Sequence, residues 1–160
     1  MLTDGDIARL LAEPKVLTFD PHQTPRKTVG ASTAGEFSVT GTAGSEFVIK
    51  LRQSKVNVFD FSIILCYIEP GTNHAFRLRR YNGKSHSHSN TLERTAQFYD
   101  FHIHMATERY QRAGIKEDSY AEVSNRYSDS HTALDCMIQD CGFELPRSGQ
   151  LSLLTPGGSP

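Results

Sequence analysis

The sequence lacks the features that mark several classes of protein. It has no tryptophan and only three cysteines in 160 residues, too few and too odd in number for a disulfide framework. No apolar run reaches the roughly 18 residues that a membrane-spanning helix needs. The acidic start MLTDGDIARLLAEPK has no signal-peptide design. We therefore expect a cytoplasmic protein that does not interact with membranes.

The composition is that of a folded domain, but the charge is unevenly distributed. Hydrophobic residues make up 38% of the chain and charged residues 22%, which is close to globular averages. Residues 70–116 carry eight bases against three acids, and residues 117–144 carry seven acids against one base. A basic segment attracts phosphate or another anion, and the acidic segment near the C-terminus is a candidate surface for a protein partner.

Hydrophobic periodicity predicts a helix followed by strands. Thr3 and Asp6 form a capping-box-like start before Ile7, Leu10 and Leu11 at helical spacing, and Pro14 ends this helix. Residues 18–35 have no period and predict an extended linker. From residue 36 to residue 105 the period becomes two, which predicts five strands: EFSVTGT, SEFVIKLRQ, VNVFDFSIILCYIEP, HAFRLRRYNG and QFYDFHIHM.

A helical period then returns in residues 117–143, with Ser119 and Glu122 as a capping box. The predicted fold class is α+β, with an antiparallel meander of about five strands, a short N-terminal helix and a long C-terminal helix packed on the sheet. We expect one domain over residues 1–145 and a flexible tail over residues 146–160, which is rich in proline, glycine and serine.

Histidines gather in the strand-rich region. Residues two apart on a strand point the same way, so the pattern D-x-H-x-H places Asp100, His102 and His104 on one face of the fifth strand. His86 and His88 lie upstream in the loop GKSHSHSN, after the arginine-rich strand FRLRRYNG. The alternation of that strand turns Arg77 and Arg79 outward together.

Metal-independent cleavage of RNA is the first hypothesis for function. It needs groups that remove and deliver protons, fixed positive charge for the transition state, and a surface on which a base stacks. The candidate acid–base residues are His86, His88, His102 and His104, with Asp100 orienting a histidine. The candidate residues for binding RNA or a nucleotide are Arg77, Arg79, Arg80, Tyr81, Arg109 and Tyr110. The chain would then be an endoribonuclease without a cofactor.

Two alternatives stay open. Four imidazoles from His86, His88, His102 and His104 could hold zinc or another divalent transition metal. Alternatively, a basic groove could act without chemistry, as an enzyme inhibitor or as a nucleotide-binding module.

The order of FRLRRYNG, HSHSN, a strand with HIH and a C-terminal helix, within residues 56–141, resembles small bacterial proteins of unassigned function. It is also similar to histidine-rich toxins of toxin–antitoxin pairs, although the proline–histidine cluster of those toxins is missing. The resemblance implies a toxin–antitoxin or phage–host conflict setting, with RNA as one possible target.

Overall fold

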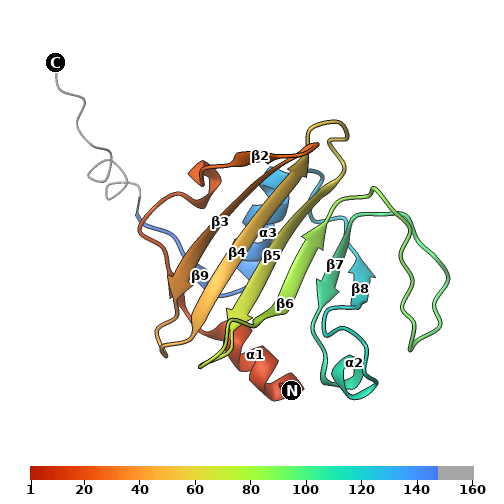
Figure 1. Ribbon diagram of the computed structural model, residues 1–160, viewed down its shortest axis with the longest axis horizontal. Coiled ribbons are helices and arrows are strands. Elements are labelled where there is room, and N and C mark those ends of the chain that lie inside the picture. Colours follow the sequence, from red (N-terminus) through yellow and green to blue (C-terminus); the bar gives the residue numbers. More distant parts are fainter. Residues whose placement is uncertain (148–160) are drawn as a thin grey trace.

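A seven-stranded antiparallel sheet forms the centre of the computed structural model, which describes residues 1–147. The strands are joined as a meander in chain order (Figure 1): β2 (Lys27–Val29), β3 (Ser32–Thr40), β4 (Glu46–Ser54), β5 (Phe61–Ile68), β6 (Ala75–Asn82), β7 (His102–Met105) and β8 (Tyr120–Val123). The predicted α+β class and antiparallel meander are confirmed. The predicted number of strands was too low, because β2 and β8 add one strand at each edge.

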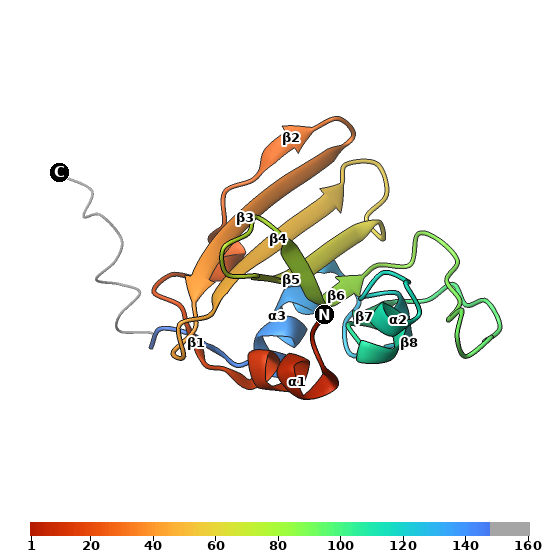
Figure 2. The same ribbon diagram turned by 60° about the horizontal axis from the view of Figure 1, so that its bottom comes forward.

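The helices within residues 1–147 are short: α1 (Asp4–Ala12), α2 (Glu108–Arg112), α3 (Ser130–Asp140) and the 3-10 turn η1 (Pro21–Gln23). α1 begins at the predicted Thr3 and Asp6 capping box. Both α1 and α3 lie on the same side of the sheet (Figure 2). Beside them β1 (Lys15–Val16) pairs in parallel with β9 (Phe143–Glu144). No helix in this described range has the length and apolarity needed to cross a bilayer.

The predicted long C-terminal helix is wrong in its first half. Residues Tyr120–Val123 form β8, which pairs antiparallel with β7, and α3 starts only after Asp129, which caps it with Thr132. Tyrosine and valine favour strands, and a free strand edge beside them supplied the hydrogen bonds that a helix would have made internally. The predicted flexible tail starts at residue 146, and its residues 148–160 lie outside the described part.

The two faces of the sheet differ in character. The face under α1 and α3 holds the hydrophobic core, to which β4 contributes Phe47, Ile49 and Leu51 and β5 contributes Phe61, Ile63 and Leu65. We call the opposite side the open face; its cross-strand neighbours include Lys50, Ile64 and Arg80.

A register shift in β6 changes which arginines share a face. The pairing of β5 with β6 slips by one residue between Leu65 and Cys66. Arg80 pairs with Ile64 and Arg77 with Cys66, so both lie on the open face, whereas Arg79 pairs with Leu65 on the core side. The expectation that Arg77 and Arg79 point outward together is therefore wrong, because a bulge interrupts the simple alternation of side chains.

Candidate functional site

The predicted histidine row lies on the open face of β7. In the register of β6 and β7, His104 is opposite Arg80 and His102 is opposite Asn82. Directly opposed residues of an antiparallel pair share a face, so the two imidazoles lie side by side next to an arginine and an asparagine. Their ring centroids are 4.9 Å apart.

Both histidines of β7 are oriented by backbone carbonyl groups. The Nδ1 atom of His102 lies 2.7 Å from the carbonyl oxygen of Asp100, and that of His104 lies 2.8 Å from the carbonyl oxygen of Asp118. A carbonyl only accepts hydrogen bonds, so Nδ1 carries the proton and Nε2 keeps its lone pair. Both Nε2 atoms are buried and have no hydrogen-bond partner in the described chain.

His88 completes a group of three imidazoles, which we call the three-histidine cluster (His88, His102 and His104). The ring centroid of His88 lies 4.7 Å from that of His104 and 5.5 Å from that of His102. One nitrogen from each of the three rings lies within 4.8 Å of the other two. An ion at about 2.0–2.1 Å from each nitrogen, as in zinc sites, would draw these atoms closer together. His88 comes from the loop between β6 and β7, so residues distant in the chain converge here.

Burial keeps the cluster uncharged. It lowers the pKa of His102 to about 4 and, with the charge of Arg80 as the next cause, that of His104 to about 2. Burial also lowers the pKa of His88. These imidazoles are therefore neutral at neutral pH, which is the form that binds metals. A group that is already unprotonated cannot serve as the general acid of RNA cleavage.

His86 and Asp100 do not take their predicted places. His86 is exposed and contacts His102 edge-on at 5.3 Å between ring centroids, but it is not one of the three converging residues. Asp100 orients His102 through its backbone carbonyl group and not through its carboxylate. The identity of the side chain does not predict such an interaction.

The four predicted arginines each lie beside an acid. Arg80 donates from Nε to Asp118 at 2.9 Å, and Arg77 approaches the same carboxylate at 4.0 Å. Arg109 pairs with Glu93. On the core side, Arg79 lies in electrostatic range of Asp140 in α3. The charges of these four arginines are therefore balanced within the fold, and Arg80 is the one that lies opposite a histidine of β7.

The two predicted stacking tyrosines are buried. Tyr81 and Tyr110 are both 0% exposed. Tyr81 donates its hydroxyl to Asp140 at 2.7 Å, and Tyr110 donates to Glu93 at 2.6 Å. Neither ring offers an open face to a base, and both act as hydrogen-bonding members of the core.

Acidic residues of the segment 117–144 are also engaged inside the chain. Asp118 is 0% exposed, Asp129 caps α3, and Asp140 forms a two-pronged ion pair with Arg126. The hypothesis of an acidic partner surface stays a prediction, with fewer free carboxylates to support it than the sequence suggested.

Asn90 was missed as a site residue, although it ends the HSHSN string. Its amide Nδ2 donates to the carbonyl oxygen of Ala121, and its Oδ1 accepts from the Ala121 N–H, both at 2.8 Å. Oδ1 also lies 3.2 Å from Nε2 of His88. Asn90 thus fastens the loop of residues 83–101 to the outer edge of β8 and positions His88 over β7. An asparagine in a polar loop carries no local signal for this role.

Replacing Asn90 with alanine should lower the free energy of unfolding by about 2 kcal/mol, because it leaves the N–H and carbonyl of Ala121 buried without partners. Denaturant unfolding measures the loss, and amide exchange should rise in residues 83–101. Asn125→Ala, at an exposed asparagine, is the matched control, with an expected change within about 0.5 kcal/mol. Equal effects of the two substitutions would contradict the anchoring role.

A second group containing histidines lies at the surface between η1 and α3. His22 pairs with Asp135 at 2.7 Å and stacks on His131 with centroids 3.7 Å apart and planes 17° from parallel. The in-plane lone pairs of stacked rings run parallel instead of converging on one point. We interpret this group as a hydrogen-bonded connection between η1 and α3.

No protein-family model, no curated protein and no solved structure matches this chain. The similarity to histidine-rich toxins, with the setting it implies, stays a prediction that rests on the sequence alone.

Proposed function

We propose that this protein binds a divalent transition-metal ion through the three-histidine cluster. The observation that carries the proposal is the pair of buried Nε2 atoms of His102 and His104 that lack any partner in residues 1–147. A buried lone pair without a hydrogen bond is costly, and coordination of an ion would satisfy both.

The surroundings of these nitrogens support the same conclusion. Histidines that bind metals usually donate the other ring N–H to a carbonyl or carboxylate, which sets the tautomer. His102 and His104 both do so, to Asp100 and Asp118. Neutral imidazoles without a thiolate favour zinc, nickel, cobalt, copper or iron over magnesium or calcium. The cluster suits zinc most simply, with three protein ligands and a further position open.

Metal analysis tests the proposal directly. Protein purified without a metal-affinity tag should take up one zinc or cobalt ion per chain, and His102→Ala or His104→Ala should abolish stoichiometric uptake. Saturating metal should also raise the melting temperature, because ligands that bind only the folded state stabilise it; the gain is about 2.7 kcal/mol at a hundredfold excess over Kd. The control is His74→Ala, which removes an exposed histidine paired with Glu69 and should leave uptake unchanged.

Two results would overturn the proposal. One is the absence of metal uptake by the wild-type protein, and the other is equal loss of uptake in His74→Ala. An RNA cleavage assay with and without chelator adds a test of the metal-free alternative. Cleavage that persists in chelator and needs His102 or His104 would return these residues to acid–base chemistry.

A further inference from the structure

Arg80 holds a positive charge next to the proposed metal site. It lies directly opposite His104 in the strand register of β6 and β7. Only its Nε is engaged, by Asp118. Within the described chain the two Nη groups donate no hydrogen bond, and 22% of the side chain is exposed. Arg80 therefore has donors available at the edge of the cluster.

One carboxylate serves two arginines at this point. Asp118 is fully buried; its Oδ2 accepts from Arg80, and its Oδ1 has no hydrogen-bond partner, with Nη1 of Arg77 at 4.0 Å. The three imidazole ligands are neutral, so a bound divalent ion would keep its full charge. Glu117 also lies here, with its Oε1 accepting from the N–H of Arg77 at 3.1 Å, so two carboxylates balance the two arginines. The two charges of a bound dication would then have no counterion among these side chains, which favours the binding of an anion.

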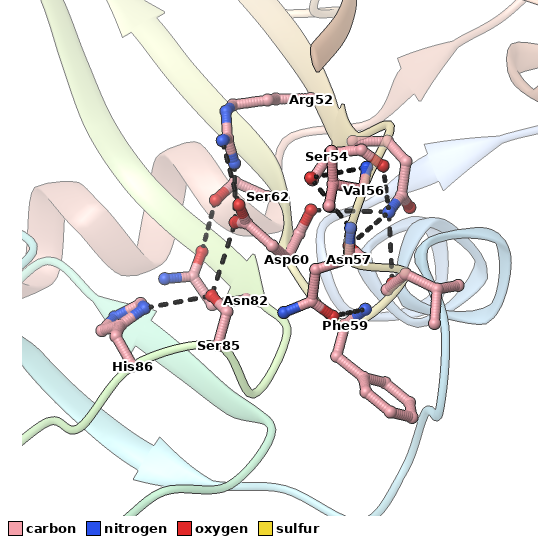
Figure 3. A network of polar contacts seen from close by, with 12 residues as sticks. Arg52, Ser54, Val56, Asn57, Phe59, Asp60, Ser62, Asn82, Ser85 and His86 are labelled. Atoms are coloured by element: carbon pink, nitrogen blue, oxygen red, sulfur yellow. Dashed lines mark hydrogen bonds and ion pairs between the residues drawn. The ribbon is translucent and has the colours of Figure 1, made fainter. Parts of the chain in front are cut away.

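The exposed histidine of the loop is held by other contacts. Nδ1 of His86 lies 3.4 Å from Oγ of Ser85, which lies 3.4 Å from Oδ1 of Asp60. Asp60 is fixed in turn by a two-pronged ion pair with Arg52, at 2.8 and 3.1 Å (Figure 3). This chain of contacts links His86 to the start of β5 and to β4. His86 is also not one of the three converging residues, so the fourth coordination position is open to an outside ligand.

We propose that this fourth position takes a phosphate group that bridges the metal ion and the guanidinium of Arg80, with Arg77 close by. The planar fork of arginine matches phosphate geometry, and a metal ion binds a second oxygen of the same group. This inference rests on the proposed metal site and adds the class of its ligand, a phosphate monoester or a phosphodiester.

Cobalt-substituted protein provides the test, since the visible spectrum of Co²⁺ reports a change of ligand. Inorganic phosphate should change the spectrum saturably. The variant Arg80→Met, in which Arg77 remains beside the Asp118 carboxylate, should weaken phosphate binding about tenfold, the loss expected for one charge-assisted hydrogen bond. Its cobalt stoichiometry should stay at one per chain. Arg80→Lys, which keeps the charge and the partner of Asp118, should show a smaller loss. Arg94→Met, at an exposed arginine of the same loop, should bind phosphate as the wild type does.

The failures of the two proposals are distinguishable. Cobalt uptake with a spectrum that phosphate does not alter would overturn the phosphate site and leave the metal site intact. The absence of cobalt uptake would remove both. A phosphate response that appears only in His86→Ala would show that His86 fills the fourth position, which also overturns the inference. Where phosphate does bind, competition by a nucleoside monophosphate or by an RNA oligonucleotide without terminal phosphates assigns the group to a monoester or to a diester.

Discussion

Replacing Lys15 with methionine should lower the free energy of unfolding by about 3 kcal/mol, the loss expected when several buried carbonyl groups lose a charged donor. Lys15 is 0% exposed. Its ammonium group contacts the carbonyl oxygens of Leu10, Glu13 and Cys141 at 2.8 to 2.9 Å and that of Leu11 at 3.3 Å. It also lies 4.2 Å from the centroid of the Phe47 ring.

These carbonyl groups lie at the C-terminal ends of two different helices. Those of Leu10, Leu11 and Glu13 belong to the C-terminal end of α1, and that of Cys141 to the C-terminal end of α3. Helix C-termini carry partial negative charge and favour a cation. Burial lowers the pKa of Lys15 to about 8, so the ammonium form still predominates at neutral pH. A single cation thus holds the two helices together beneath the sheet.

Denaturant unfolding compares Lys15→Met with Lys55→Met, a matched change at an exposed lysine, for which a change within about 0.5 kcal/mol is expected. Similar losses in the two variants would show that the buried contacts of Lys15 contribute little. Metal uptake should persist in Lys15→Met wherever the variant is folded, since its helices lie on the other face of the sheet.

Replacing Gly83 with alanine should lower the free energy of unfolding by about 2 to 3 kcal/mol and weaken metal binding. The new methyl group would overpack against backbone atoms, which cannot move aside as a flexible side chain can. Gly83 follows β6, and a Cβ atom there would come within 1.8 Å of the carbonyl oxygen of Phe59. Its own N–H donates to the carbonyl of Phe61 at 3.1 Å. Relief of the clash has to move either the segment before β5 or the loop that carries His88.

Unfolding and cobalt titration measure both effects of Gly83→Ala. The control is Gly5→Ala in α1, where the new methyl group would lie 3.7 Å from Oγ1 of Thr3, an ordinary van der Waals distance. Alanine should stabilise that helix by about 0.5 to 1 kcal/mol. A destabilised Gly83→Ala protein that binds cobalt with wild-type affinity would show that the loop does not depend on this close approach.

Local sequence patterns predicted much of the fold. Alternation identified the five strands that became β3 to β7, and the Thr3 and Asp6 capping box located the start of α1. The same rule placed His102 and His104 on one face, as their pairing with Asn82 and Arg80 confirms. These features depend on neighbours in the sequence, for which side-chain period and capping chemistry suffice.

The incorrect predictions concern segments whose secondary structure or side-chain orientation depends on residues far away in the sequence. Tyr120–Val123 carries a pattern compatible with a helix, but the edge of β7 made it a strand. One slipped residue in β6 separated Arg79 from Arg77. Tyr81, chosen as a surface aromatic, lies on the core side because the same slip places it opposite Ile63, where it donates to Asp140 of α3. None of these partners lies near its residue in the chain.

The sequence by itself determined the strand meander and the pair of histidines that share the open face of β7, because both follow from the two-residue period of a strand. Only the tertiary structure decided that His88 joins this pair and that His86 lies beside it. It also decided that Asp118 holds Arg80 and Arg77 at the same place. The reason is physical: residues 83–96 have no period of their own, and the loop takes its course from the contact of Asn90 with β8 and from the close approach of Gly83 to Phe59.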